Sequence, residues 1–185
     1  MAASCTTCCA RLLATRRDDR ALTIELTIRP FTASDLPRLQ QIRAAAFRPV
    51  FQSFRDIVGE AIAGQAFATA DAEQAALLDQ LCRPDSSYRL FVAATASEIV
   101  GFVAISLNRA TRVGEIGLNA VDPANARQGI GTRLYAFALS LMRDEGMRLA
   151  TVSTGGDASH APARRAYEKL GFGAGIPAVT LYKLL

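Results

Sequence analysis

The chain has 185 residues, of which half are hydrophobic and 21% are charged, and its formal net charge is +4. These values are typical of one soluble globular domain and exclude a disordered or fibrous chain. No apolar run approaches the roughly 20 residues of a membrane span, and the basic residues form no dense stripe of the kind that nucleic-acid binders carry. We therefore expect no membrane and no nucleic acid among its partners, whereas a mildly basic surface suits a small polyanionic ligand.

The N-terminal segment predicts an extension that is separate from the folded domain. Its three cysteines are Cys5, Cys8 and Cys9. Their spacing resembles half of a zinc site, but Cys82 and His160 are isolated from each other and supply no second ligand pair, so we expect no metal. Reduced thiols fit a cytoplasmic location. We expect residues 1–20 to be disordered and residues 21–185 to form one domain.

In the first half of the chain, alternation and capping signals predict one strand followed by helices. Pro30 is expected to end the strand, and Pro49 to break the helix after it. Thr32 opens a segment with helix-start chemistry, and Asp71 is the expected cap of a later helix. The predicted elements are a strand over 22–30, a helix after Thr32, a helix over 53–63 and a helix over 72–82.

The second half alternates strands with two amphipathic helices, which completes one mixed α/β domain. Gly146 and Gly171 are expected to end the two helices. The predicted elements are strands over 88–94, 99–107, 113–121, 147–153 and near 178–184, and helices over 130–144 and 160–170.

The strand over 113–121 is expected to alternate regularly between its two faces. One face would carry Ile116, Leu118 and Ala120. The other face would carry Glu115, Gly117 and Asn119.

The segment after this strand predicts an anion-binding turn. The strand ends at Val121, and Gly129-x-Gly131 opens the next helix close to Arg127. Glycines let the backbone approach a ligand, and the first turn of a helix presents unpaired amides at the positive end of its dipole. A pyrophosphate seat is one interpretation, and a tight strand-to-helix turn without a ligand is the other. Leu134 occupies the third glycine position of the dinucleotide fingerprint, and no G-K-S/T triplet occurs, which disfavours both common nucleotide motifs.

Two segments then resemble the GCN5-related N-acetyltransferase (GNAT) family. Residues Ala126 to Gly131 resemble its hallmark Q/R-x-x-G-x-G/A, with Ala126 standing where the family has Gln or Arg. Residues 163–172 resemble its A-x-x-x-Y-E-K-x-G-F signature, with Tyr167 as the tyrosine. The family usually has Asn seven residues before this tyrosine, where it contacts the pantetheine arm, and His160 stands there in this chain.

The resemblance implies a fold and an activity. The fold is a single domain with a mostly antiparallel twisted sheet of about six to seven strands flanked by helices. The activity is transfer of an acetyl group from acetyl-CoA to a primary amine of a small molecule, peptide or protein by direct attack. The alternative is an inactive acyl-CoA sensor or interaction module of the same fold. The acceptor is not identified, and a homodimer is left open.

The resemblance also implies roles for individual residues. Glu115 is the predicted base and Tyr167 the predicted acid for the leaving thiolate, the alternatives being a surface Glu and a packing Tyr. A backbone N–H near Val121 would stabilise the oxyanion. His160, with Asp157 three residues before it, is a further hypothesis for the base. The predicted cofactor-binding residues are Ala120, Val121, Ala126, Arg127, Gln128, Gly129, Ile130, Gly131, Thr132 and His160.

Acceptor recognition is expected within residues 47–83. Four phenylalanines in this range either line an acceptor pocket or belong to the core, and the sequence leaves both open. They are Phe47, Phe51, Phe54 and Phe67.

Overall fold

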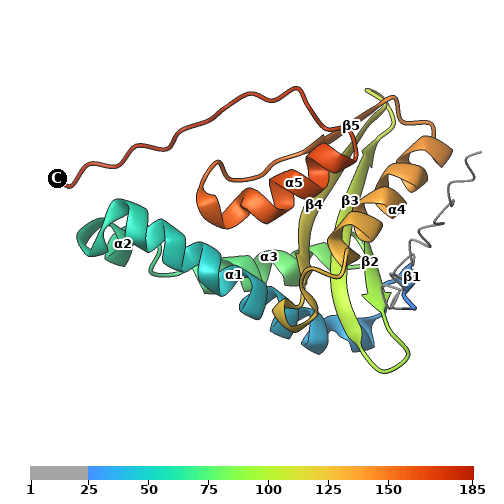
Figure 1. Cartoon of the computed structure of the whole chain (residues 1–185), viewed down its shortest axis with the longest axis horizontal. Coiled ribbons are helices and arrows are strands. Elements are labelled where there is room, and N and C mark those ends of the chain that lie inside the picture. The colour runs from blue at the N-terminus through green and yellow to red at the C-terminus, as the bar shows by residue number, and fades with distance from the viewer. Residues whose placement is uncertain (1–24) are drawn as a thin grey trace, which may run out of the picture.

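The computed structural model describes residues 25–185 and shows one sheet covered by helices on both faces (Figure 1). The predicted extension over 1–20 and its cysteines lie outside the described residues. The strands are β1 (Thr27–Pro30), β2 (Tyr88–Ala94), β3 (Ile99–Asn108), β4 (Val113–Val121) and β5 (Leu149–Val152). The helices are α1 (Leu36–Val58), α2 (Glu60–Ala66), α3 (Ala70–Leu81), α4 (Ile130–Asp144) and α5 (Ala161–Lys169). Three short 3-10 helices join them: η1 (Ala33–Asp35), η2 (Pro123–Asn125) and η3 (Ala158–His160).

The sheet has the order β1-β2-β3-β4-β5 and is antiparallel except for the parallel pair β4 and β5. This confirms the mostly antiparallel mixed fold. A parallel pair requires a crossover, which α4 supplies. The pairing of β4 with β5 ends at Ile116 and Val152, whereas β4 continues along β3 to Val121. The two parallel strands therefore separate, and the sheet is open beside the last five residues of β4.

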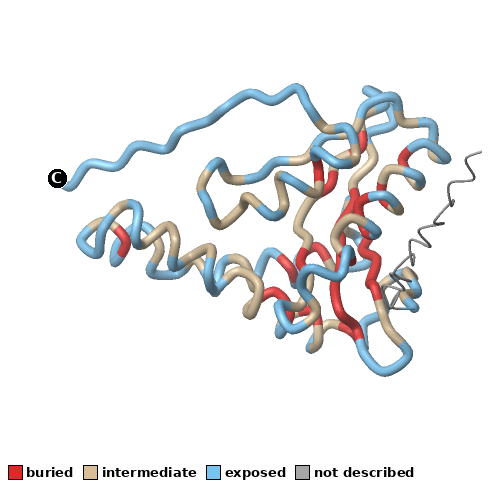
Figure 2. The backbone as a smooth tube through the Cα atoms, viewed as in Figure 1, coloured by how far each residue is buried: buried red, intermediate tan, exposed pale blue. Residues whose placement is uncertain are grey.

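Two apolar clusters hold the layers together, one on each face of the sheet. The cluster under α4 and α5 includes Ile116, Leu134 and Met142. The cluster under α1 and α3 includes Leu39, Ile42 and Phe102. Figure 2 shows that the buried backbone concentrates in the central strands. Burying each large aliphatic side chain contributes about 1.5–3 kcal/mol, so the sheet is the rigid frame on which the site is built.

A β-bulge in β4 corrects the expected regular alternation. Two residues of this strand, Gly117 and Leu118, lie opposite one residue of β3, because the register shifts between Val103 and Ile105. Asn119 therefore faces α4 and α5, while Leu118 packs on the other face. A glycine inside a strand is the sequence signal of such a bulge. The prediction that Asn119 shares a face with Glu115 was wrong for this reason.

Helix α1 runs through Pro49 as one helix, so the predicted break and the separate helix over 53–63 were wrong. Pro49 is exposed, and the carbonyl that it leaves unbonded one turn earlier can be hydrated. The helix instead ends at Gly59, whose φ of +80° favours glycine. The N-cap of α3 is Thr69, not Asp71 as predicted. Asp71 lies in the first turn of α3 and accepts a hydrogen bond at 2.7 Å from the buried Arg43 of α1.

The chain after Gly171 contains no strand, so the predicted strand near 178–184 is absent and the sheet has five strands. This tail crosses from the end of α5 towards α2 (Figure 1). A strand forms only by pairing with a neighbour, and no pairing of the tail occurs within the described residues. Tyr182 makes an edge contact with Phe67 at 5.9 Å between ring centroids. The exposed apolar residues of the tail are Ile176, Val179, Leu181, Leu184 and Leu185.

The predicted helix start after Thr32 is confirmed and is held by Asp35. The Oδ2 atom of Asp35 accepts hydrogen bonds from the amide of Thr32 at 2.8 Å and from its hydroxyl at 3.0 Å. The same carboxylate pairs with Arg29 at 2.7 Å. The hydrogen bond from Arg29, opposed by burial and helped by Thr32, lowers the pKa of Asp35 to about 2. This ion pair fixes the entry of α1 to the end of β1.

Candidate active site

The turn before α4 is open at Gly129. Gly129, the N-cap of α4, has a φ of +74°, and a Cβ added to it would find no atom within 4 Å. Arg127 also adopts a positive φ, of 64°, and is exposed. Left-handed backbone costs a non-glycine residue roughly 1–2 kcal/mol, so the turn holds Arg127 in a strained conformation. The residues present therefore leave space at this turn for a ligand.

The first turn of α4 supplies the chemistry of an anion site. The first helical hydrogen bond runs from the amide of Arg133 to the carbonyl of Gly129 at 3.0 Å. The amides that precede it have no partner within the helix and lie at its positive end. Ile130 is 2% exposed and anchors the turn to the core. The guanidinium of Arg133 donates to the carbonyl of Leu26 at 3.0 Å, so it also ties α4 to the start of β1.

An ion-pair network fixes the junction between β4 and the turn. Arg38 of α1 donates to Asp122 at 2.5 Å and to Glu98 at 2.9 Å. Asp122 also accepts from the amide of Ala124 at 2.9 Å and so caps η2. The start of the turn is therefore held by a side chain of α1 that lies 84 residues earlier in the sequence. Ala126, the C-cap of η2, is exposed.

The end of β4 presents a backbone donor to the opening in the sheet. The amide of Asp122 donates to the carbonyl of Val100 on β3 at 2.9 Å. Because successive amides of a strand point to opposite edges, the N–H of Val121 points to the edge from which β5 has separated. Ala120, by contrast, is buried in the core beneath α1. The oxyanion role of the Val121 amide stays a prediction.

Tyr167 of α5 lies buried above the bulge of β4. Its ring packs on Tyr135 with 4.6 Å between centroids. Asn119 donates from Nδ2 to the Tyr167 hydroxyl at 3.3 Å and accepts from the Tyr135 hydroxyl at 2.7 Å. Burial, together with Tyr167, raises the pKa of Tyr135 far above its usual range, so Tyr135 stays a neutral donor. Asn119 therefore orients the phenol that the sequence assigns as the acid.

Glu115 lies on the other face of the sheet from Tyr167. Its carboxylate accepts hydrogen bonds from the Tyr88 hydroxyl at 2.9 Å and from the Ser106 hydroxyl at 3.5 Å. Burial and this carboxylate raise the pKa of Tyr88, so the phenol remains protonated and donates. The structure therefore does not bring the predicted base and the predicted acid together, and Glu115 is engaged by a neighbouring phenol.

His160 lies at the N-cap of α5 and is paired with Asp157. Its Nδ1 is 2.6 Å from Oδ1 of Asp157. Oδ2 of Asp157 accepts from the amide of Ser159 at 3.0 Å and from Ser53 of α1 at 3.2 Å. The guanidinium of Arg164 donates to the carbonyl of Asp157 at 2.8 Å. This cluster joins the loop after β5 to the middle of α1.

The four phenylalanines of the expected acceptor region are half-buried, and of these Phe47 packs against the core cluster under α1 and α3. The ring of Phe54 stacks on His160 with 5.9 Å between centroids and an angle of 21°. It also meets Phe67 at 5.6 Å. Phe47 and Phe51 form a second pair at 6.2 Å. Aromatic side chains therefore lie along α1, and Phe54 brings them into contact with His160.

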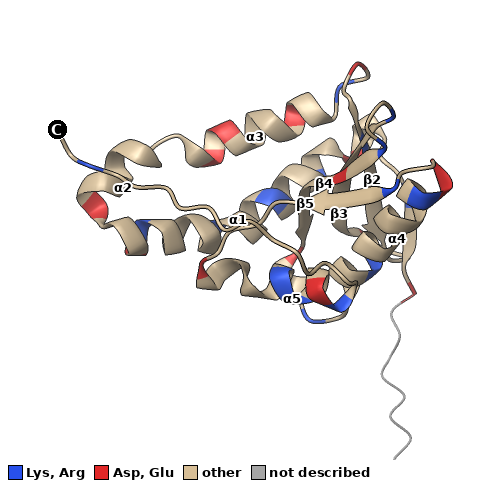
Figure 3. Ribbon diagram, turned by 90° about the horizontal axis from the view of Figure 1, so that it is seen from above, with Lys and Arg blue, Asp and Glu red and all other residues tan. Residues whose placement is uncertain are grey.

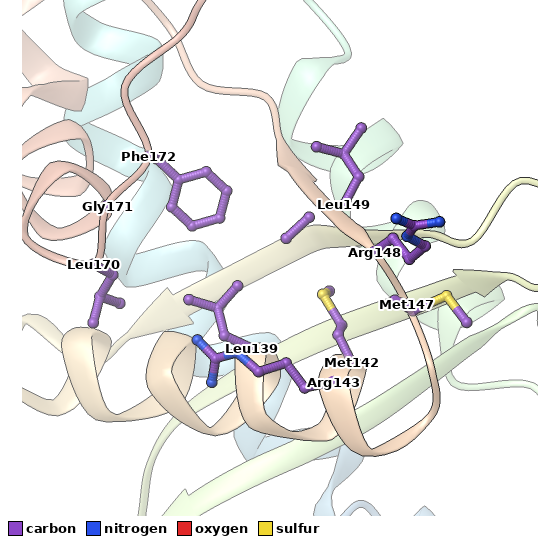
Figure 4. Close-up of a pocket in the computed structure, with 10 residues that line it drawn as sticks. Leu139, Met142, Arg143, Met147, Arg148, Leu149, Leu170, Gly171 and Phe172 are labelled. Atoms are coloured by element: carbon purple, nitrogen blue, oxygen red, sulfur yellow. The ribbon is translucent and has the colours of Figure 1, made fainter.

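Two hollows lie away from these residues. One, of about 240 Å³, lies between β5, the second half of α4 and the start of the tail (Figure 4). Leu139, Met142 and Phe172 line it together with Arg143 and Arg148. The other, of about 550 Å³, includes Phe31 and Cys82. Neither hollow includes a predicted site residue, and residues 126–129 of the turn before α4 are exposed.

Charged side chains are spread over several elements rather than gathered in one stripe (Figure 3). Among residues 25–185 no helix combines the length and apolarity that crossing a membrane needs. The same residues contain no cluster of three or more His, Cys, Asp or Glu side chains that could hold a metal ion.

Reasoning from the sequence missed the residues that reach the site from other segments. Asn119, Tyr88 and Ser53 each hydrogen-bond a predicted residue or its partner. Only Asn119 had a local signal, because the neighbouring Gly117 marks the bulge that turns it towards Tyr167. The contacts of Tyr88 and Ser53 depend on tertiary packing and leave no local trace.

This mixed sheet flanked by helices is the fold of a class of acyltransferases, to which a family model assigns the chain. The chain belongs to the acetyltransferase (GNAT) family, whose model matches residues 46–172. A comparison with curated proteins gives no match.

Solved structures share the fold. The PaiA N-acetyltransferase from Thermoplasma acidophilum, in complex with coenzyme A, is 17% identical with a TM-score of 0.63, over 82% of this chain and 92% of that chain. The ribosomal-protein-S18-alanine N-acetyltransferase from Escherichia coli is 20% identical with a TM-score of 0.58, over 82% and 80%. An aminoglycoside acetyltransferase from an uncultured soil metagenomic sample is 22% identical with a TM-score of 0.55, over 86% and 96%.

Proposed function

We propose that this acyltransferase moves an acetyl group from acetyl-CoA to a primary amine of a small molecule, peptide or protein by direct attack. The observation that carries the proposal is the open turn at Gly129, where no atom lies within 4 Å of the position that a Cβ would take at the N-cap of α4. A diphosphate at this end gains roughly 0.3–1 kcal/mol from the dipole, in addition to its hydrogen bonds.

The rest of the site supports a route for the acyl group. From the turn, an extended substrate would follow the opening between β4 and β5 towards α5. The N–H of Val121 would stabilise the oxyanion, and the buried phenol of Tyr167, oriented by Asn119, would protonate the leaving thiolate. Two of the similar solved structures, named for a ribosomal-protein alanine and for aminoglycosides, support an amine acceptor. A cytoplasmic location is part of the proposal, supported by the free thiol of Cys82.

Binding and turnover test the proposal in that order. A ligand that binds only the native state at a hundredfold excess over its Kd adds about 2.7 kcal/mol of stability. We therefore expect acetyl-CoA to raise the melting temperature and NAD or ATP to leave it unchanged. Release of free thiol with a panel of amines, followed by mass detection of the acetylated product, then shows transfer. An unchanged melting temperature with acetyl-CoA would remove the proposal.

A further inference from the structure

His160 is the single histidine of the chain, and its partner prepares it to accept a proton. The ionised carboxylate of Asp157 can only accept, so the Nδ1 atom that lies 2.6 Å from it carries the hydrogen. The Nε2 atom is then the unprotonated nitrogen of the ring. The two side chains are 19% and 11% exposed, so the pair is largely shielded but still reached from one side.

The negative charge of Asp157 is stabilised by several hydrogen bonds, of which only one comes from the histidine. Burial opposes this charge, but hydrogen bonds from Ser159 and His160 overcome it and lower the pKa of Asp157 to about 2. Ser53 of α1 donates a further hydrogen bond at 3.2 Å. A fixed carboxylate next to an imidazole holds the ring in one tautomer and stabilises the imidazolium that forms when Nε2 takes a proton.

The surroundings hold the imidazole in one place. A side chain at Gly155 would clash with the ring of His160 and with the carboxylate of Asp157, so only glycine fits against the pair. Arg164 donates to the carbonyls of Gly155 and Asp157, which fixes the loop. The ring of Phe54 covers one side of the imidazole. These contacts come from the loop, α5 and α1, and together they orient the ring.

The position of His160 relative to Tyr167 matches the span of the reacting groups. Residues seven apart lie on one face of a helix, two turns and about 10 Å from each other. A hydrogen bond of about 3 Å at each end and a near-attack contact of about 3 Å between amine and thioester fill a distance of this size. His160 is the N-cap of α5, and Tyr167 lies in the last turn of this short helix.

We propose, on the basis of the function proposed above, that His160 is the general base and that Asp157 is its positioning residue. The ammonium of the acceptor gives one proton to Nε2, and the freed lone pair of the nitrogen forms the C–N bond to the thioester carbonyl carbon. The C–S bond then breaks with its electron pair on sulfur. The thiolate receives a proton from Tyr167, and the second proton of the nitrogen, lost as the amide forms, passes through water to the tyrosinate and restores the phenol. The proton on Nε2 is released to solvent before the next turnover, so that the cycle yields the amide, the free thiol and one proton.

The competing base is Glu115, and its environment is less suited to the task. Its carboxylate already accepts from Tyr88 and Ser106, and it lies across the sheet from Tyr167. The imidazole of His160 has other neighbours, and the one charged group in contact with it is the carboxylate of Asp157. These neighbours are Asp157 and Ser159 from the loop, Ser53 and Phe54 from α1, and Arg164 from α5, whose guanidinium is directed at carbonyl oxygens.

The first measurement is the pH profile of kcat/KM for the amine at saturating acetyl-CoA, in the wild type and in His160→Gln. We expect acetyl-CoA still to raise the melting temperature of His160→Gln, whereas kcat falls about 10²–10⁴-fold. The acid limb that reports protonation of the base should be absent in the variant. Because the chain has one histidine, its ring signals in the NMR spectrum need no assignment. In the protein saturated with coenzyme A, the ring signals of His160 should change with pH around the midpoint of the acid limb of kcat/KM.

Further variants separate a base from a structural residue. Asp157→Asn should reduce kcat while KM for acetyl-CoA is retained, and Gly155→Ala should do the same by displacing the ring, although it removes no functional group. Glu168→Gln, an exposed residue of α5, is the control for removing one ionisable group from this helix. The base assignment is overturned if His160→Gln keeps kcat within threefold, or if the acid limb persists in it and disappears in Glu115→Gln. If the wild type neither binds acetyl-CoA nor transfers, it is the proposed function that fails.

Discussion

The turn before α4 and the loop before α5 both lead into a helix on the same side of the sheet, but they differ in how many side chains pack around them. The α4 turn is exposed and bare, and a side chain at Gly129 would point into open space. The α5 loop is filled by side chains, with Asp157 already accepting from the amide of Ser159. One helix start therefore offers its amides to an anion, whereas the other uses its carboxylate to hold an imidazole.

In the proposed function, the α4 turn binds the acetyl donor and the α5 loop carries out proton transfer. Backbone amides recognise a phosphate whatever residues surround them, so the α4 turn suits the donor, which is the invariant part of the chemistry. Proton transfer requires a side chain held in one orientation, and the cluster around His160 provides it. Tyr167 lies between the two, on α5 but oriented by Asn119 of β4.

The largest expected effect comes from Tyr167→Phe, which removes the phenol hydroxyl but keeps the buried ring. If the hydroxyl protonates the thiolate, kcat should fall by about 10²–10⁴-fold while KM for acetyl-CoA stays close to that of the wild type. Tyr135→Phe is the matched control, because it removes the neighbouring hydroxyl on the same asparagine. Full activity in Tyr167→Phe would leave this tyrosine with a packing role only.

A second effect, on binding, contrasts the two ends of α4. Gly129 and Gly146 both have a positive φ, and a Cβ at either would meet no atom within 4 Å. Asp tolerates this backbone region, and its charge favours the N-terminal end of a helix by about 0.3–1 kcal/mol. Gly129→Asp should therefore be the more stable of the two variants without ligand, but should weaken acetyl-CoA binding at least about tenfold, or roughly 1.4 kcal/mol.

Gly146→Asp should show the opposite order, with lower stability and unchanged binding. Calorimetric titration with acetyl-CoA measures the affinity of the two variants, and chemical denaturation measures their stability, so that the two opposite orders can be compared. Equal loss of binding in the two would mean that the N-terminal end of α4 has no special role for the phosphates.

The last expected effect is on acid stability, and it leaves activity at neutral pH untested. The pKa of Asp157 is about 2 in the folded protein, against an ordinary value of 3.8. Its contribution is complete above pH 4 and is lost as the pH falls towards 2, and it amounts to about 2 kcal/mol. Unfolding by urea at pH 5 and at pH 2.5 should show a smaller pH dependence in Asp157→Asn. Asp35, whose pKa is also about 2, and Glu145, whose pKa is lowered by hydrogen bonds from Arg89 and Arg109, contribute to the slope that remains in the variant. The account of the loop fails if the pH dependence is the same in wild type and variant.

The α4 turn could be predicted from the sequence because its features are local. A strand end, two glycines and an amphipathic helix lie within one short segment, and the structure has strands β2 and β4 and helix α4 at the predicted residues. The same reasoning failed where a local signal competes with tertiary packing. Pro49 is accommodated inside α1 because it faces water, and the apolar tail residues formed no strand because nothing pairs with them.

The α5 loop was only partly predictable for a related reason. His160 and Asp157 are close in sequence, so their pairing is a local event. Ser53 and Phe54, which complete the cluster, come from α1 and reach it only because that helix crosses under the loop. The bulge at Gly117 likewise reversed the face of Asn119, and a single glycine in a strand does not say which way the register will shift.

The central claim, that the bare amides at the head of α4 bind the diphosphate of acetyl-CoA, is tested most directly by a titration of the isotope-labelled protein followed through its amide NMR signals. The largest shifts should fall on Gly129, Ile130, Gly131 and Thr132, with smaller ones along the opening beside Val121. If these four amides stay unmoved while signals around the hollow of Leu139 and Phe172 shift, the claim is contradicted.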